Sequence, residues 1–380
     1  MTVDRRVVFF GTYDSGAHPR VLVLAQGLRS RGATVVECNA PLRISTAERV
    51  AAVRRPWRLP LLAMRVAQRW WRLLRMVRRM DRAERSATDA VVVGYLGLLD
   101  VHLARMLFRR TPIVLDHMTG AAETAADRRL GGGVRQRVLR AVDRAAWSRA
   151  DIVVVDTDEQ LAALPAGVRE RGVVCAVGAP DAWMAAGARA HTAEPDGGPL
   201  RVVFFGLFTP LQGAPTIGAA AALLTDRPVS FTLIGHGQDE AATRRAAAGA
   251  AVRWLPWADP DDLPRLVAEH DVCLGIFGTS PKAHRVVPNK VFQGAAAGCA
   301  IITADTGPQR RALAGAALLV PPGDAAALAG ALERLATDRD ELARLRRQAR
   351  SAAQERFTAH EVVRPLWQRL GTPGGGNDDA

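Results

Sequence analysis

Short apolar runs alternate with segments of helical spacing along nearly all of the 380 residues. In the N-terminal half the runs are "RVVFFGT", "ATVVECN", "DAVVVGYLG", "TPIVLDHM" and "ADIVVVDT". Continuous apolar runs are typical of strands buried on both faces, and the helical segments between them supply the crossovers that parallel strands require. The alternation therefore predicts an α/β fold in which helices cover a parallel sheet.

The same order of elements starts again near residue 200. There "LRVVFFGLF" echoes "RRVVFFGTY" from the start of the chain, and further apolar runs follow it. The stretch 186–199, "AGARAHTAEPDGGP", is polar and rich in Gly and Pro, which suits a linker. We predict two tandem Rossmann-like domains, residues 1–190 and 191–355, and a disordered tail over 371–380.

No run of about 18 uncharged apolar residues occurs, and charges interrupt the start of the chain where a signal peptide is apolar. We therefore expect a cytoplasmic protein. The four cysteines, Cys38, Cys175, Cys273 and Cys299, are too far apart in sequence for a local metal site and too few for a disulfide scaffold. They are expected to be small buried side chains.

The net charge of +13 is concentrated in residues 43–85, which hold thirteen arginines and three acidic residues. Within this segment, residues 61–80 form an amphipathic pattern at helical spacing. Such a helix can lie on an anionic membrane or dock its apolar face on the sheet, and the sequence leaves both open. Nucleic acid is not expected as a partner because no recognition motif accompanies the charge. The apolar positions are Leu62, Val66, Trp70, Leu73, Leu74, Val77 and Met80, with arginines opposite.

Ligands of parallel sheets bind beyond the carboxyl ends of the strands, so the loops after strands are the candidate sites. Three of these loops carry glycine pairs that permit a close approach of backbone to a phosphate. Each pair alone is more often a turn than a site. The pairs are Gly11 with Gly16, Gly206 with Gly213, and Gly235 with Gly237.

The chain has only two lysines, Lys282 and Lys290, and its other 49 basic residues are arginine. Both lie in "SPKAHRVVPNKVFQGAAAGC", where Pro288 begins a predicted helix and Asn289 and Lys290 lie in its first turn. A helix N-terminus carries a partial positive charge, and an adjacent ammonium adds to it. We predict a diphosphate site at this turn, to which Arg285 and His284 could contribute.

Two further polar positions follow strands. His117 ends the run "PIVLDH", which is a ligand-facing position or a capping one. The sequence Asp156-Thr157-Asp158 resembles a metal-binding Asp-x-Asp, but Thr157 and Gln160 also form a helix capping box. We favour the cap, and no metal is expected.

The motifs resemble those of the retaining, nucleotide-sugar-dependent glycosyltransferases of family 4, which have the GT-B fold of two Rossmann-like domains with parallel sheets facing across a cleft. "LAQGLRSRGATV" is similar to the helix and strand after the family's diphosphate-facing loop, which places Ser15 and Gly16 in that loop. The resemblance places His117 beside the sugar, Gly235 and Gly237 in the Gly-x-Gly turn, and Trp257 in the base-binding loop. It also implies that a C-terminal helix, about 356–370, returns to the first domain.

The chain departs from the family at four positions. Leu207 and Gln212 stand where the family often has a diphosphate-binding arginine and lysine. Arg285 and Gln293 stand where it has two glutamates. Gln293 can still bond a ribose hydroxyl, whereas an arginine cannot replace a carboxylate. We hypothesise that Lys282, Arg285 and Lys290 took over the cationic role of positions 207 and 212.

The resemblance implies a hexosyltransferase that moves a sugar from a nucleoside-diphosphate sugar to a hydroxyl or amine, with retention of configuration. The donor would bind the second domain without a metal or other cofactor, and the acceptor would bind the first. A lipid-linked acceptor would suit a peripheral membrane position. Alternatives are a sugar-nucleotide epimerase of the same fold and an inactive protein that binds sugar nucleotides.

Overall fold

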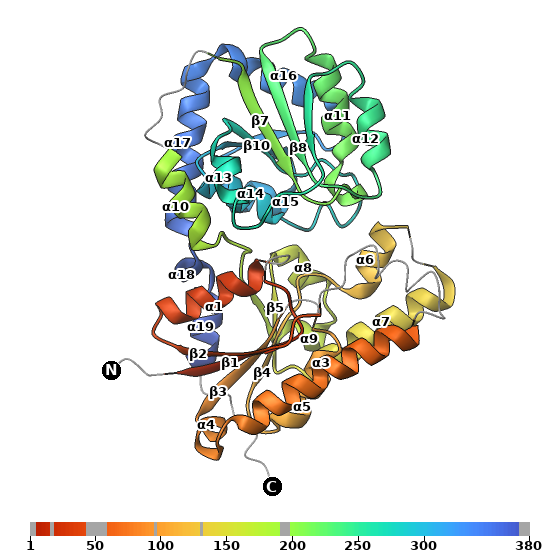
Figure 1. The fold of residues 1–380 in the computed structure, drawn as a ribbon, viewed down its shortest axis with the longest axis vertical. Coiled ribbons are helices and arrows are strands. Elements are labelled where there is room, and N and C mark those ends of the chain that lie inside the picture. Colours follow the sequence, from red (N-terminus) through yellow and green to blue (C-terminus); the bar gives the residue numbers. More distant parts are fainter. Residues whose placement is uncertain are drawn as a thin grey trace.

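The computed structural model describes residues 5–15, 19–42, 59–94, 97–129, 132–190 and 198–371. It contains two domains, each built on a six-stranded sheet (Figure 1). The strand orders are β2-β1-β3-β4-β5-β6 and β12-β11-β10-β7-β8-β9. All neighbouring strands are parallel. The predicted α/β class and the tandem pair of Rossmann-like units are confirmed.

The five strands predicted for the first domain are present, and the structure adds a sixth, β6. Its strands are β1 (Arg6–Gly11), β2 (Thr34–Asn39), β3 (Thr88–Val93), β4 (Ile113–Asp116), β5 (Ile152–Val155) and β6 (Gly172–Val174). Its helices are α1 (Arg20–Ser30), α3 (Leu59–Arg79), α4 (Arg82–Ser86), α5 (Asp100–Leu107), α6 (Ala121–Asp127), α7 (Gly133–Trp147), α8 (Asp158–Ala163) and α9 (Ala166–Arg169).

The two faces of the first sheet bury different sets of apolar side chains. Phe9 contributes to the core beneath α1, and Phe10 contributes to the core beneath α3 and α5. Because side chains of a strand alternate between faces, a sheet covered on both sides needs apolar residues at every position. Burying one phenylalanine stabilises the fold by about 2–3 kcal/mol relative to exposure.

The second domain repeats the arrangement. Its strands are β7 (Leu200–Phe205), β8 (Val229–Ile234), β9 (Val252–Leu255), β10 (Val272–Leu274), β11 (Ala300–Ala304) and β12 (Leu318–Val320). Its helical elements are η2 (Pro210–Gln212), α11 (Ala214–Leu223), α12 (Glu240–Ala246), α13 (Leu263–Ala268), α14 (Asn289–Ala296), α15 (Gly307–Leu313), α16 (Ala325–Thr337) and α17 (Arg339–Arg356). The strand order changes direction between β7 and β10, and ligands of such sheets bind at this switch point.

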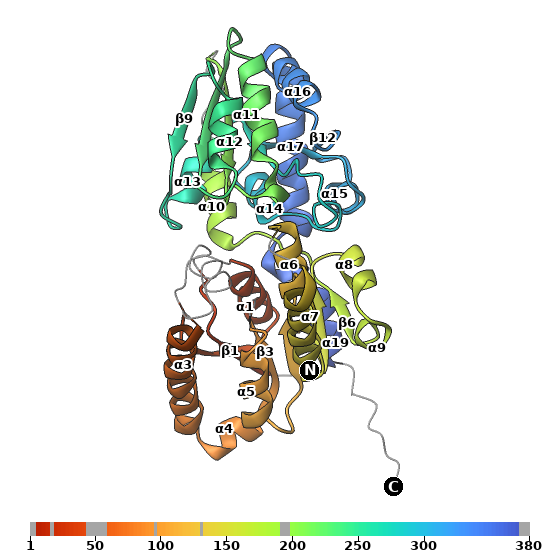
Figure 2. The same cartoon turned by 90° about the vertical axis from the view of Figure 1, so that its right-hand side faces the viewer.

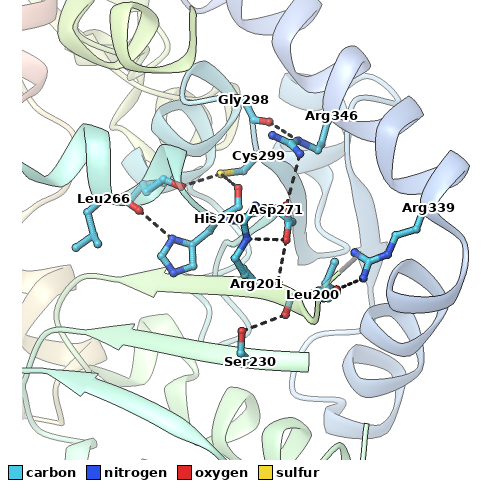
Figure 3. Close-up of polar contacts among 12 residues, drawn as sticks. Leu200, Arg201, Ser230, Leu266, His270, Asp271, Gly298, Cys299, Arg339 and Arg346 are labelled. Carbon is cyan, nitrogen blue, oxygen red and sulfur yellow. Dashed lines mark hydrogen bonds and ion pairs between the residues drawn. The ribbon is translucent and has the colours of Figure 1, made fainter. Parts of the chain in front are cut away.

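A buried carboxylate joins the amino ends of β7 and β10 to α17 (Figure 3). Asp271 accepts hydrogen bonds from the backbone and side chain of Arg201 and pairs with Arg346 at 3.5 Å. Beside it, His270 contacts the Leu266 carbonyl and the Thr232 hydroxyl, and burial lowers the pKa of its ring. These contacts lie at the amino ends of the strands, far along the sheet from the ligand-binding edge, and they hold α17 on the domain.

Two helical segments connect the domains. Helix α10 (Asp181–Ala190) packs on the second domain, where Trp183 stacks on Phe205 with ring centroids 5.4 Å apart. Helices α18 (Ala359–Val362) and α19 (Arg364–Gly371) return to the first domain, where Val363 and Leu366 join the core beneath α1. Figure 1 shows α18 and α19 beside α1. Residues 372–380 of the predicted tail lie outside the described residues.

Helix α3 docks the predicted apolar face on the first domain. Leu73 and Val77 are fully buried, and Trp70 donates to Asp100 at 2.8 Å. Its outer face combines arginines with Leu61, Met64 and Trp71, which are 51%, 52% and 56% exposed. Docking on the sheet therefore accounts for the apolar face, while the outer face is a separate, mixed surface.

Among the described residues no helix has the length and apolar character needed to cross a membrane. All four cysteines are free and buried, as predicted.

Candidate functional site

The loops at the carboxyl ends of both sheets meet at the boundary between the domains. Glycines of the second domain let the loops after β7 and β8 pack backbone against backbone. A Cβ on Gly235 would lie 2.0 Å from the Gly206 carbonyl oxygen, and one on Gly237 would lie 2.5 Å from that of Phe208. Gly206 itself has a φ of +135°, which side chains rarely adopt. Gly235 and Gly237 thus shape the loop after β7 through direct packing.

Lys290 points into this packed region. Its ammonium contacts Gln212 Oε1, lies 3.7 Å from the centroid of the Phe204 ring and is close to Gly206. The lysine is only 4% exposed. The ammonium of Lys290 therefore lies beside position 212, where the glycosyltransferases that the sequence resembles often have a diphosphate-binding lysine.

No carboxylate pairs with Lys290 among the described residues. Burial lowers the pKa of its ammonium from 10.5 to about 7, and Cys273 opposes this slightly. A buried cation without a counter-ion is costly, and strongly shifted pKa values of this kind cluster at functional sites. The geometry therefore favours an anionic ligand at this position.

Lys282 and Arg285 face the first domain instead. Lys282 Nζ donates to Thr124 Oγ1 at 3.2 Å, and Arg285 forms an ion pair with Glu123. The backbone carbonyl of Arg285 also accepts from Thr157 Oγ1 at 2.5 Å. The three predicted cations thus have different partners. Lys290, in the first turn of α14, contacts residues of its own domain, whereas Lys282 and Arg285 contact the first domain.

Helix α6 reaches the boundary between the domains (Figure 2). A cavity of about 440 Å³ lies between α6 and the loop 279–285. Glu123 and Asp127 line it from the first domain, and Lys282 and Arg285 line it from the second. Asp127 also accepts from Ser280 Oγ at 2.6 Å. The lining thus presents charged hydrogen-bond donors and acceptors to the cavity.

His117 follows β4 and is 5% exposed. Its ring stands edge-on to Trp147, with centroids 5.3 Å apart, and its backbone N–H donates to Val154 at 2.7 Å. Burial lowers the pKa of the imidazole to about 4. His117 is therefore neutral at physiological pH and can donate or accept one hydrogen bond.

A buried charge cluster lies next to His117 and was missed by the sequence reasoning. Arg20 Nε pairs with Asp116 at 2.7 Å, and Arg20 Nη1 donates to the Ala176 carbonyl at 2.9 Å. Asp156 is also buried, and burial raises its pKa to about 7 against the opposing effect of Arg20. One polar atom of each of the three charged side chains has no partner within the described residues. The signal was present, since Asp116 and Asp156 both end buried strands and Arg20 begins α1.

Asp156 and Asp158 are separated by the structure. Asp158 is on the surface and lies 3.7 Å from Arg311, whereas Asp156 is buried. Thr157 caps α8 by accepting from the Gln160 N–H at 3.1 Å, which is one of the two hydrogen bonds of the predicted capping box. The side-chain nitrogen of Gln160 has no partner in the described part of the chain. Across the described ranges no group of three or more His, Cys, Asp or Glu side chains is placed to hold a metal.

The remaining predicted residues lie around the same edge. Gln293 is buried one helical turn after Lys290, and Asn289 is the first residue of α14. Trp257 follows β9 and is 64% exposed, Ser15 and His284 are exposed, and Gly16 lies outside the described residues. The structure thus brings Gly206, Gln212, Gly235 and Lys290 together, and it places Trp257 farther out on the loop after β9.

Residues 199–338 match the family model described as Glycosyl transferases group 1. The match spans most of the second domain, which contains the Lys290 region. No curated protein matches the sequence significantly.

Several solved structures share the fold over nearly their whole length. Sucrose-phosphate synthase from Thermosynechococcus elongatus is 16% identical, with a TM-score of 0.65 and coverage of 96% of this chain and 98% of that one. Anabaena Alr3699/HepE in complex with UDP-glucose is 16% identical, with a TM-score of 0.63 and coverage of 97% and 100%. A UDP-forming α,α-trehalose-phosphate synthase from Burkholderia vietnamiensis is 14% identical, with a TM-score of 0.61 and coverage of 97% of each chain. At these identities the likeness establishes the fold, and the predicted GT-B arrangement is confirmed.

Proposed function

We propose that the protein is a glycosyltransferase that moves a hexose from a nucleoside-diphosphate sugar to an acceptor hydroxyl or amine, with retention of configuration. The observation that carries the proposal is the ammonium of Lys290, buried beside Gly206 and Gln212 without a carboxylate partner in the described residues. It lies at the switch point of the second sheet, within the region that matches the glycosyltransferase family. The fold shared with proteins whose structures hold UDP-glucose supports the same assignment.

In this proposal the donor diphosphate lies against Lys290 and the first turn of α14. Departure of the nucleotide leaves negative charge on the β-phosphate, and a positioned cation stabilises that charge without a metal. Helix amides of α14 and the loop of Ser15 and Gly16 would complete the phosphate site. The test is the variant Lys290→Ala, for which we expect a raised donor KM or lost turnover; unchanged kinetics would contradict the role.

The other residues receive roles from the same arrangement. Neutral His117 would orient the sugar, Gln293 would bond the ribose, and Trp257 would border the base. The turn of Gly235 and Gly237 would shape the phosphate loop. Lys282 and Arg285 would line the sugar end of the site together with the carboxylates of α6.

The nucleotide can be identified by thermal shift with uridine, thymidine, guanosine and adenosine diphosphate sugars. A ligand that binds the folded state raises the melting temperature, and one member of the panel should do so selectively. Product analysis with and without candidate acceptors then separates a transferase from an epimerase, which turns over without an acceptor. A panel in which no member raises the melting temperature would contradict the proposal.

The proposal includes a peripheral position on an anionic membrane, through the outer face of α3. This helix has no acidic residue, and its outer face combines exposed Trp71, Leu61 and Met64 with arginines. Arginines draw a helix to anionic headgroups, while exposed apolar side chains insert at the interface. Because the predicted apolar face is used in docking, the membrane-facing surface would be the opposite one.

A further inference from the structure

Lys290 is surrounded by groups that cannot balance its charge. β7 presents the Phe204 ring, and β10 presents Cys273. The loop after β7 presents Gly206 and the side-chain oxygen Oε1 of Gln212. In the described part of the chain, Cys273 is the one titratable group close enough to influence the protonation of Lys290. Burial raises the pKa of the Cys273 thiol well above 9, so Cys273 is itself neutral. The free protein therefore offers the ammonium one amide oxygen and one aromatic ring.

These contacts favour the ammonium only weakly. A cation over an aromatic ring gains about 0.5–2 kcal/mol, and a hydrogen bond to a neutral amide does not replace the lost hydration. The pKa of about 7 follows from this imbalance, so a large share of Lys290 is neutral amine near physiological pH. A neutral amine keeps the N–H donor that Gln212 accepts, and the hydrogen bond survives deprotonation.

We propose that binding of the nucleotide-sugar donor places one proton from solvent on Lys290, so that the site becomes fully cationic only when the diphosphate arrives. This inference rests on the proposed function, because it takes the diphosphate as the ligand of Lys290. The proton leaves a buffer molecule and forms an N–H bond on Nζ, and the new ammonium pairs with a phosphate oxygen. The donor carries no group that titrates near neutrality, so the lysine is the acceptor of this proton.

The coupling of donor binding to protonation of Lys290 gives donor affinity a defined pH dependence. Below about pH 7 the free protein already holds the proton, so donor affinity is constant there. Above that pH each unit weakens donor affinity about tenfold, until the pKa of the donor-bound lysine is reached. Lys290→Arg keeps its charge at all pH values and should bind the donor with no such dependence.

The scarcity of lysine makes a direct test practicable. Protein labelled with ¹³C at lysine Cε should show two signals, which belong to Lys282 and Lys290 and are assigned with Lys282→Arg. In the free protein the Lys290 signal should titrate near pH 7. Addition of UDP-glucose should move that midpoint upward. A free-protein midpoint near 10, the usual range of a lysine, would overturn the inference whether or not the donor binds.

Calorimetry measures how many protons the protein takes up when the donor binds. UDP-glucose binding is measured in buffers of different ionisation enthalpy, and the slope of heat against ionisation enthalpy gives the protons taken up. At about pH 8 the expected uptake is about 0.9 proton per donor, and at about pH 6 it is about 0.1. Lys290→Arg should take up almost none at either pH.

These measurements distinguish failure of the proton-uptake inference from failure of the proposed function. Donor binding with equal uptake at both pH values, or with unchanged uptake in Lys290→Arg, overturns the inference and leaves the proposed function standing. Failure of every nucleoside-diphosphate sugar to bind contradicts the proposed function, while the titration of the free protein still decides the state of Lys290.

Discussion

The guanidinium of Arg285 donates to the carboxylate of Glu123, so one ion pair links the loop before α14 to α6 of the other domain. The side chains of the pair are 35% and 19% exposed. Ser280 and Lys282 in the same loop contact Asp127 and Thr124 of α6. The loop that leads to Lys290 is thus held by contacts from the opposite domain.

Charge reversal at either residue of this pair should impair activity, and reversal at both should restore part of it. Arg285→Glu and Glu123→Arg each place like charges together, so we expect each to lower kcat/KM, and the double variant should recover part of the loss. A coupling of about 1 kcal/mol, or about fivefold in kcat/KM, is typical of a partly buried pair. Additive effects in the double-mutant cycle would show that the contact does not contribute.

Gly206→Ala should disturb the lysine without unfolding the domain. A Cβ at this position would lie 3.2 Å from Lys290 Nζ, and the φ of +135° would be strained. We expect a loss of donor affinity that exceeds the loss of stability. Gly249→Ala is the matched control, because it has a φ of +87° with no atom within 4 Å of its Cβ and lies away from the site. Donor titrations and thermal melts of both variants make the comparison.

Trp71→Ala should weaken association with anionic vesicles. Trp71 is 56% exposed on the outer face of α3, and its loss should lower partitioning roughly tenfold if the ring inserts at the interface. Trp257→Ala removes an equally exposed tryptophan from the other domain and serves as the flotation control. Equal flotation of all three proteins would exclude a role for Trp71 in vesicle binding, and no flotation with anionic vesicles would exclude the membrane position.

Asp156→Asn should alter the pH dependence of stability. The pKa of Asp156 is raised from 3.8 to about 7 by burial, so the native state binds more protons than the unfolded state between those values. Stability from this group is complete below about pH 4 and is lost as pH rises toward 7. The difference in unfolding free energy between wild type and variant should therefore shift in favour of the variant as pH rises. A difference that stays constant over this range would show that Asp156 is ionised throughout.

The sequence predicted the fold because its signals are local. Runs such as "VVFF" are apolar at every position, which is typical of a sheet covered on both faces, and the repeat of that run at β7 marks the second domain. The unusual placement of the two lysines also indicated a site, and both are buried, Lys290 within the second domain and Lys282 against α6 of the first.

The sequence could not show which partner each charge would meet. Arg285 and Lys282 lie within eight residues of Lys290, yet they contact α6, which is about 160 residues away in the chain. Arg20 and Asp116 form a buried pair across 96 residues. Such contacts depend on how loops from different strands converge, and no periodicity in one segment records them.

Lys290→Met should stabilise the free protein most at and below neutral pH. The drop of the Lys290 pKa from 10.5 to about 7 corresponds to about 5 kcal/mol, at about 1.4 kcal/mol per pKa unit. The unfolded state binds the proton more tightly between these values, so wild-type stability rises with pH across this range, while below about pH 7 the whole penalty is present. Denaturant titrations at several pH values should show that the difference in unfolding free energy between Lys290→Met and wild type narrows as pH rises. A difference that widens, or a variant less stable than wild type at about pH 7, would mean that an anionic group in the free protein already balances the ammonium.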